Sequence, residues 1–135
     1  MEKFDIIIQG GQSNAEGFGI GPDREEYVKN PNILYLEAEK KITQLPVSCA
    51  IEFLDKPYSI TVADYHETEK GTTGDFALSF ANEYVKKGYL EEGRKILIIR
   101  AAVGGTGYKT NQWGKGKILE EKMFELTDYA LSLNP

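Results

Sequence analysis

The chain has 135 residues, 41% of them hydrophobic, which fits one domain with its own core. Its formal net charge is −5 and its basic residues are scattered, so neither nucleic acid nor an anionic membrane surface is an expected partner. No apolar segment is long enough to cross a bilayer, and the first residues enter a strand without a leader-like apolar stretch, so a cytoplasmic location is expected.

The first expected strand covers residues 4–9. Ile6-Ile7-Ile8 is a short β-branched run that stops at Gly10 and Gly11, and such a run predicts a buried parallel strand leading into a loop. The polar residues 22–29 fit a short helical turn. Residues 33–36 and 41–45 flank a polar tetrapeptide, which predicts a small surface β-hairpin.

The middle of the chain has few clear periods. Within residues 46–73 only 58–62 resembles a strand, and the remainder predicts a long excursion over the surface. The single cysteine, Cys49, cannot form an internal disulfide and is expected to be a small buried side chain.

Two helices are expected in the second half, over residues 75–87 and 118–133, with a strand at 96–100 between them. Asp75 suits the N-terminal end of the first helix, and Gly88 follows its C-terminal end. Apolar residues recur along this helix at helical spacing and predict its core-facing side. They are Phe76, Ala77, Phe80, Ala81 and Tyr84.

The order strand, helix, strand, helix requires a right-handed crossover and a parallel strand pair. We therefore predict an α/β fold, a three-layer sandwich of the flavodoxin-like type with a parallel sheet. Ligands bind open α/β sheets beyond the carboxyl ends of the strands. The loops after residues 9 and 100 are therefore expected to lie together at one edge of the sheet.

Ser13 is the candidate nucleophile in the first of these loops. The alternative is that it serves only as a turn or capping residue, as most serines in glycine-rich turns do. The G-x-S-x-G elbow is absent, because Ala15 stands two residues after Ser13. A phosphate cradle at Gly17 to Gly21 is disfavoured, because both the P-loop ending and the dinucleotide-binding spacing are missing.

Ester hydrolysis by a serine needs a nucleophile, a base and donors that stabilise the oxyanion. Ser13 can supply its hydroxyl and its own N–H. Gly104 or Gly105 can supply a second N–H, because a residue without Cβ lets the backbone approach a substrate closely. The alternative for these two glycines is a plain tight turn.

Gly11-Gln12-Ser13-Asn14 resembles the first block of the SGNH hydrolase superfamily, and within it the sialate O-acetylesterase and acetylxylan esterase group. Residues 96–106 resemble that group's strand-plus-GGT block, and residues 74–81 resemble the helix start between the two. The three blocks occur in the family's order and span residues 4–113.

The resemblance implies one SGNH-like domain over residues 1–135, corresponding to the N-terminal portion of the family fold. It implies a serine esterase that removes acetyl groups from acetylated carbohydrates, with Ser13, Gly104 and Gly105 as the catalytic groups. Five further loop residues are expected to hold the sugar, although each alone also fits a structural role. They are Gln12, Asn14, Thr106, Gln112 and Trp113.

Two family blocks have no match here, the W-x-Q-G-E-like strand end and the final Asp-x-x-His. His66 is the only histidine, stands before Gly104-Gly105 in the wrong order, and is expected to be a surface residue. The fold is therefore expected to be truncated after the second strand–helix unit, with impaired catalysis.

Two alternatives to an impaired esterase stay open. One is a non-catalytic carbohydrate-binding or interaction module. The other is a half-enzyme completed by another chain, either as a homo-oligomer or with a complementing C-terminal segment. No cofactor is expected, and no cluster of side chains has metal-ligand spacing, so no metal is expected either.

Overall fold

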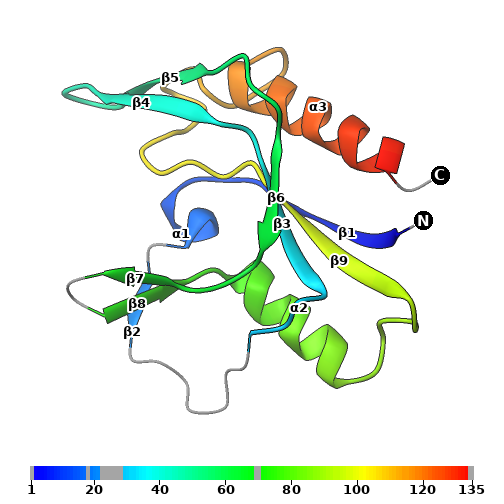
Figure 1. Ribbon diagram of the computed structural model, residues 1–135. Coiled ribbons are helices and arrows are strands. Elements are labelled where there is room, and N and C mark those ends of the chain that lie inside the picture. The colour runs from blue at the N-terminus through cyan, green and yellow to red at the C-terminus, as the bar shows by residue number, and fades with distance from the viewer. Residues whose placement is uncertain (1, 18, 22–28, 69–70, 134–135) are drawn as a thin grey trace.

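The computed structural model describes residues 2–17, 19–21, 29–68 and 71–133. Its centre is a four-stranded sheet with helix α2 (Phe76–Lys86) on one face and helix α3 (Ile118–Leu133) on the other (Figure 1). The predicted α/β sandwich is therefore confirmed, as are both predicted helices, but the sheet predicted to be parallel is mixed, because β6 (Ser59–Val62) runs antiparallel to β3 (Ile33–Glu37).

Strand order in the central sheet is β1-β9-β3-β6. The first three strands run parallel, and the fourth is antiparallel to its neighbour. Their bounds are β1 Lys3–Gln9, β9 Arg94–Arg100, β3 Ile33–Glu37 and β6 Ser59–Val62. The predicted strands at 4–9, 58–62 and 96–100 correspond to β1, β6 and β9.

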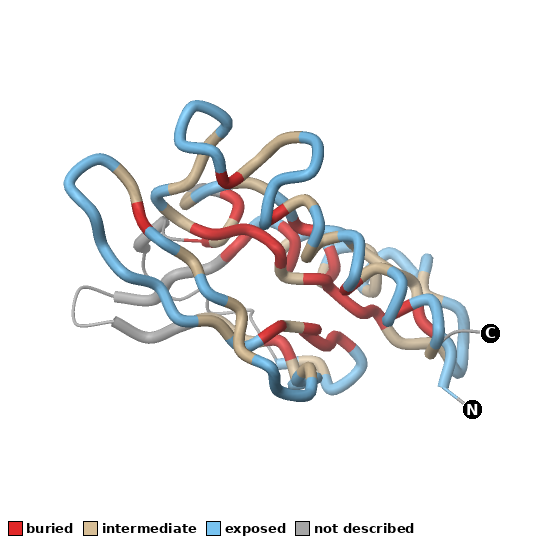
Figure 2. Tube along the Cα trace, turned by 90° about the horizontal axis from the view of Figure 1, so that it is seen from above, coloured by how far each residue is buried: buried red, intermediate tan, exposed pale blue. Residues whose placement is uncertain are grey.

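Strand β9 is the centre of the core. Figure 2 shows buried segments running through the middle of the molecule. Residues 96–99 have no exposed surface, because β9 has a strand on each side and a helix over each face. Leu97 and Ile99 pack with Leu126 of α3, whereas Ile96 and Ile98 pack with Leu78 of α2. This two-sided burial explains the continuous apolar run in β9.

The predicted hairpin of residues 33–36 with 41–45 is wrong. Strand β3 pairs with β9 and β6, whereas β4 (Lys40–Gln44) pairs with β5 (Cys49–Phe53) in a separate two-stranded sheet. The physical reason is burial: residues 33–36 are all buried, as suits an inner parallel strand, whereas residues 41–44 are exposed.

The expected surface excursion over residues 46–73 is largely ordered into strands. It contains β5, β6 and β7 (His66–Thr68), and β7 joins β8 (Gly71–Gly74) and β2 (Gly19–Gly21) in a three-stranded antiparallel sheet. The helical turn expected at 22–29 lies almost wholly outside the described residues.

Helix α2 packs against the sheet through two alanines and a leucine, and the aromatic Tyr84 lies partly buried against the same cluster. Ala77, Leu78 and Ala81 are buried against the sheet, whereas Phe76 and Phe80 are 64% and 58% exposed. The prediction that these two phenylalanines face the core is therefore wrong. Small side chains bring the helix close to the strands and leave the phenylalanine row on its outer side.

Asp75 fixes the start of α2 as its N-cap residue. Its carboxylate is buried and accepts hydrogen bonds from Leu78 N at 2.7 Å and from Tyr35 Oη at 2.7 Å. Since Tyr35 lies in β3, one side chain ties the helix to an inner strand.

We expect Asp75→Ala to lower the free energy of unfolding by about 2–4 kcal/mol, because both buried donors lose their acceptor. Asp75→Asn keeps a capping oxygen and should lose about 1 kcal/mol. Urea denaturation measures both losses, and equal losses for the two variants would contradict the capping role.

Candidate active site

Two loops that are far apart in the sequence lie side by side beyond the carboxyl ends of β1 and β9. The parallel ladder between these strands continues into the loops, because Ala101 N donates to Gln9 O at 2.9 Å and Val103 N donates to Gly11 O at 3.1 Å. The Ser13 turn and the Gly104-Gly105 turn therefore start from adjacent positions, which confirms that the two loops share one sheet edge.

The Ser13 loop is a single helical turn, α1 (Ser13–Glu16), where the sequence predicted a loop. Gly11 leads into it with a φ of +139°, and a Cβ there would lie 2.8 Å from Ala15 Cβ. Glycine is thus required twice at this position, for the backbone angle and for the close approach.

Polar side chains at the ends of two strands hold α1 in place. Gln9 Nε2 donates to Ala15 O, and Arg100 Nη2 donates to Glu16 O at 2.6 Å. Both accepting carbonyls belong to the last residues of the turn, which have no partner further along a helix. Gln9 is 3% exposed, and its Oε1 is a buried oxygen that finds no hydrogen-bond partner among the described residues.

Gln12 governs the orientation of Ser13. Its Oε1 accepts from Ser13 N at 2.7 Å and also from the Ser13 hydroxyl. A carboxamide oxygen is not a useful base, so this contact orients the hydroxyl without activating it. The Ser13 N–H, which now donates to Gln12, could donate to an acyl oxygen in its place.

The Gly104-Gly105 turn is held from both sides. Gly104 N donates to Glu16 Oε2 at 2.7 Å, and Gly105 O accepts from Ser48 Oγ at 3.2 Å. Cys49 Sγ, buried as predicted, lies 3.8 Å from Gly104 O. Gly105 has a φ of +75°, which favours glycine. In the part of the chain that the structure describes, its N–H makes no hydrogen bond.

Thr106 and Trp113, both expected to hold a sugar, contact each other next to this turn. Trp113 Nε1 donates to Thr106 Oγ1 at 3.0 Å, and Thr106 Oγ1 donates to Val103 O at 2.6 Å. The indole ring lies over Gly10, where a Cβ would be 3.5 Å from Trp113 Cη2. The partly buried ring therefore lies close to the start of the Ser13 loop.

Gln112 lies beneath the turn and is 7% exposed. Its Nε2 donates to Ser48 Oγ at 2.6 Å and to Cys49 O at 2.9 Å, which connects the loop to β5. Contact between Gln112 and a substrate stays a prediction, and it would require this network to open.

The remaining predicted positions are less informative. Asn14 is the second residue of α1, and its side chain lies outside the description. His66 begins β7 and pairs with Thr73 of β8.

Among the described residues no group of three or more His, Cys, Asp or Glu side chains could hold a metal ion. None of the helices described is long and apolar enough to cross a membrane.

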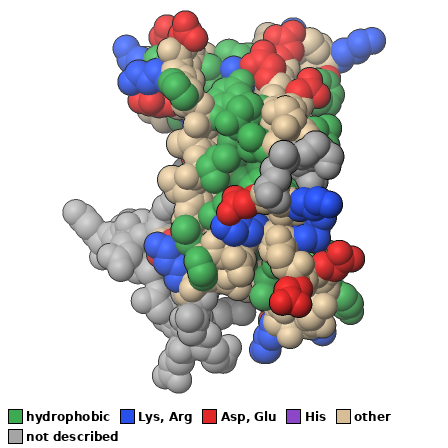
Figure 3. Space-filling model, turned by 45° about the vertical axis from the view of Figure 1, so that its right-hand side comes forward, with side chains coloured by type: hydrophobic (Ala, Val, Ile, Leu, Met, Phe, Trp, Pro, Cys, Tyr) green, Lys and Arg blue, Asp and Glu red, His purple; other side chains and the backbone are tan. Residues whose placement is uncertain are grey.

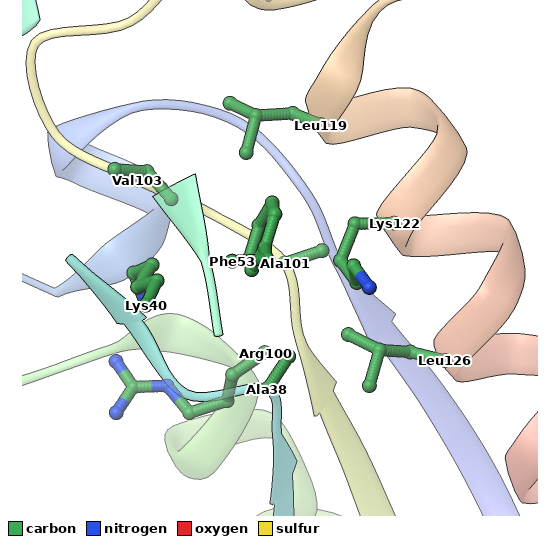
Figure 4. A pocket seen from close by; sticks show the side chains of 9 residues that line it. All are labelled: Ala38, Lys40, Phe53, Arg100, Ala101, Val103, Leu119, Lys122 and Leu126. Atoms are coloured by element: carbon green, nitrogen blue, oxygen red, sulfur yellow. The ribbon is translucent and has the colours of Figure 1, made fainter. Parts of the chain in front are cut away.

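A small pocket lies between α3 and the end of β9 (Figure 4). Ala101, Val103, Leu119 and Leu126 give it an apolar lining, and the Arg100 guanidinium points away from it. Its interior of about 10 Å³ has room for roughly one water molecule, so it is not a sugar site.

Lys122 also borders this pocket. Burial would lower the pKa of Lys122, but its hydrogen bond to Glu125, at 2.6 Å, and the nearby charges raise it above the ordinary value. The lysine is therefore expected to be a cation at neutral pH.

Sequence reasoning missed four residues that build the site: Gln9, Glu16, Ser48 and Arg100. A usable signal existed for Gln9 and Arg100, because each is a polar residue ending an apolar strand run and so is placed at the loop edge. No comparable local signal marks Glu16 or Ser48, whose partners are 88 and 57 positions away in the sequence.

The family model for carbohydrate esterases of the sialic acid-specific acetylesterase type matches residues 3–132. The chain belongs to this family. The resemblance of its GQSN and GGT blocks to the sialate O-acetylesterase group is thereby confirmed.

Two solved structures have a similar fold. The crystal structure of NanS is 22% identical, with a TM-score of 0.65 over 99% of this chain. A protein from Arabidopsis thaliana is 24% identical, with a TM-score of 0.54 over 91% of this chain. The chain spans 50% of the length of each of these two structures. No match was found among the curated protein sequences.

The crowding at Gly11 predicts a specific loss of stability. Gly11→Ala combines a strained backbone with overpacking against Ala15 and should cost about 3 kcal/mol or more of unfolding free energy. Gly93→Ala is the matched control, because Gly93 has a φ of +81° but open space around it, and it should cost about 1–2 kcal/mol. Urea unfolding of both variants measures the difference, and equal losses would show that the close approach to Ala15 has no energetic weight.

Proposed function

We propose that the chain carries the nucleophile side of a serine carbohydrate O-acetylesterase of the SGNH type, which removes acetyl groups from acetylated sugars. The observation that carries the proposal is the continued β1–β9 ladder, because it sets the Ser13 turn beside the Gly104-Gly105 turn. Membership of a family of carbohydrate esterases supports the substrate class. The cytoplasmic location expected from the sequence stays a prediction.

In the proposed reaction, Ser13 Oγ attacks the acetyl carbonyl carbon and the hydroxyl proton passes to a base. Gln12 must release Ser13 first, because its Oε1 now accepts both Ser13 donors. The carbonyl oxygen becomes an oxyanion, which the Ser13 N–H and an N–H of the Gly104-Gly105 turn would stabilise. Each such donor is worth about 3–4 kcal/mol of transition-state stabilisation. Thr106 and Trp113 stand close enough to this turn to contact the sugar.

Among the described residues no base contacts the Ser13 hydroxyl, whose hydrogen-bond partner there is Gln12. We therefore propose that the base comes from a polypeptide segment beyond the described residues. Without it, oxyanion donors and binding alone still leave some rate acceleration.

Hydrolysis of p-nitrophenyl acetate tests the nucleophile. We expect Ser13→Ala to lower the rate well below that of the wild type, because the acyl-accepting oxygen is lost while the oxyanion donors remain. Ser59→Ala, an exposed serine in β6, is the control and should retain the full rate. Equal hydrolysis by the wild type and Ser13→Ala would reject the esterase proposal. Saccharide binding that survives Ser13→Ala would then favour a carbohydrate-binding module.

The exposed edge of strand β1 supports the proposal that another polypeptide completes the site. Its β-branched run is typical of an inner parallel strand, yet β1 is an edge of the described four-stranded sheet. Ile8 is 49% exposed, and Phe76 and Phe80 of α2 are more exposed still. An unprotected strand edge readily pairs with a further strand. We propose that the partner is a complementing C-terminal segment, or a second copy of this chain.

Completion by a second copy predicts that specific activity rises with protein concentration. Ile8→Lys should abolish that rise, because a lysine on an edge strand opposes strand pairing. Apolar side chains also form a strip on the face shown in Figure 3, so a control for general surface effects is needed. Ile60→Lys is that control, since Ile60 is 39% exposed on β6, the opposite edge of the sheet.

Activity should be measured over a hundredfold range of protein concentration, alongside mass determination by light scattering. A constant specific activity in a monomeric protein would reject the second copy as partner. Adding a separately produced C-terminal segment would then be the remaining test of completion.

A further inference from the structure

The N–H of Gly104 is already committed to a carboxylate. Glu16 Oε2 accepts it at 2.7 Å, the short distance of a charge-assisted hydrogen bond. A hydrogen that already donates to the Glu16 carboxylate is a weaker donor to a substrate oxygen than one without an acceptor. Of the two glycine amides in the turn, Gly105 N–H is the one without a hydrogen bond to any described residue.

Both backbone polar groups of Glu16 make hydrogen bonds. Its N–H donates to Gln12 O at 2.9 Å, and its carbonyl accepts from Arg100 Nη2 at 2.6 Å. The carboxylate therefore joins two fixed points, the end of α1 and the Gly104-Gly105 turn. Because α1 also carries Ser13, this contact sets the spacing between the nucleophile and the turn.

We propose that Glu16 is a positioning residue of this site, whose carboxylate holds Gly104 N–H and so leaves Gly105 N–H as the donor for the acyl oxygen. The inference rests on the proposed esterase function, and it narrows the expected pair of glycine donors to one. Glu16 does not touch the reacting atoms and acts through the turn.

Hydrogen exchange of the Gly104 amide, followed by NMR on glycine-labelled protein, tests the contact without any activity. In Glu16→Ala the Gly104 amide should exchange about tenfold faster, because its charge-assisted acceptor is gone. Glu16→Gln keeps an oxygen acceptor and should restore most of the protection. Glu37→Gln is the matched control, because Glu37 also faces Arg100, at 3.9 Å, but belongs to β3. Unchanged Gly104 exchange in Glu16→Ala would overturn the proposal.

Kinetics with p-nitrophenyl acetate test the consequence. Glu16→Ala should lower kcat by about 10–100-fold with little change in KM, because a displaced donor affects the transition state more than binding. Glu16→Gln should recover most of kcat. A kcat that stays equal or rises in Glu16→Ala would overturn the proposal, since Glu16 would then be neutral or would obstruct the site.

The two readouts separate this inference from the function on which it rests. If the wild type shows no Ser13-dependent hydrolysis, the esterase proposal fails and the oxyanion role fails with it. Faster Gly104 exchange in Glu16→Ala would still establish the contact. If Ser13-dependent hydrolysis is present but insensitive to Glu16, the positioning role alone fails.

Discussion

The parallel pairing of β1 with β9 is the constraint on which the rest of the site depends. Seven residue pairs join the strands, and the ladder then continues through Gln9 and Gly11 into the loops. Parallel strands bring their carboxyl ends to the same edge, so two segments about 90 residues apart in the sequence become neighbours. The burial of β9 between two strands and two helices makes this strand pair a rigid support for the loops.

Polar side chains hold each of the two turns in place above this strand pair. Gln9 and Arg100 end their strands and bind the carbonyls of α1, whereas Ser48 and Gln112 hold the second turn from below. Glu16 connects the two turns directly. The geometry around the nucleophile therefore depends on a connected polar network, in which the loss of one member affects the others.

The sequence predicted the parts that follow from periodicity. Long apolar runs located β1 and β9, and helical spacing located α2 and α3. The partner of β3 was not predictable in the same way, because an apolar run does not encode which strand lies beside it. Phe76 and Phe80 show a related limit: periodicity defines an apolar side of α2, but the close packing of Ala77 and Ala81 decided which part is buried. Contacts such as Glu16 with Gly104 depend on the fold being formed first.

The position of Cys49 has a practical consequence. It is the only cysteine in the chain, it is 3% exposed, and its sulfur lies under the Gly104-Gly105 turn. A thiol reagent can reach it only when that turn lifts or β5 separates from it. The rate of alkylation therefore reports how often the turn opens, with no engineered label, and a ligand that settles on the turn would slow it.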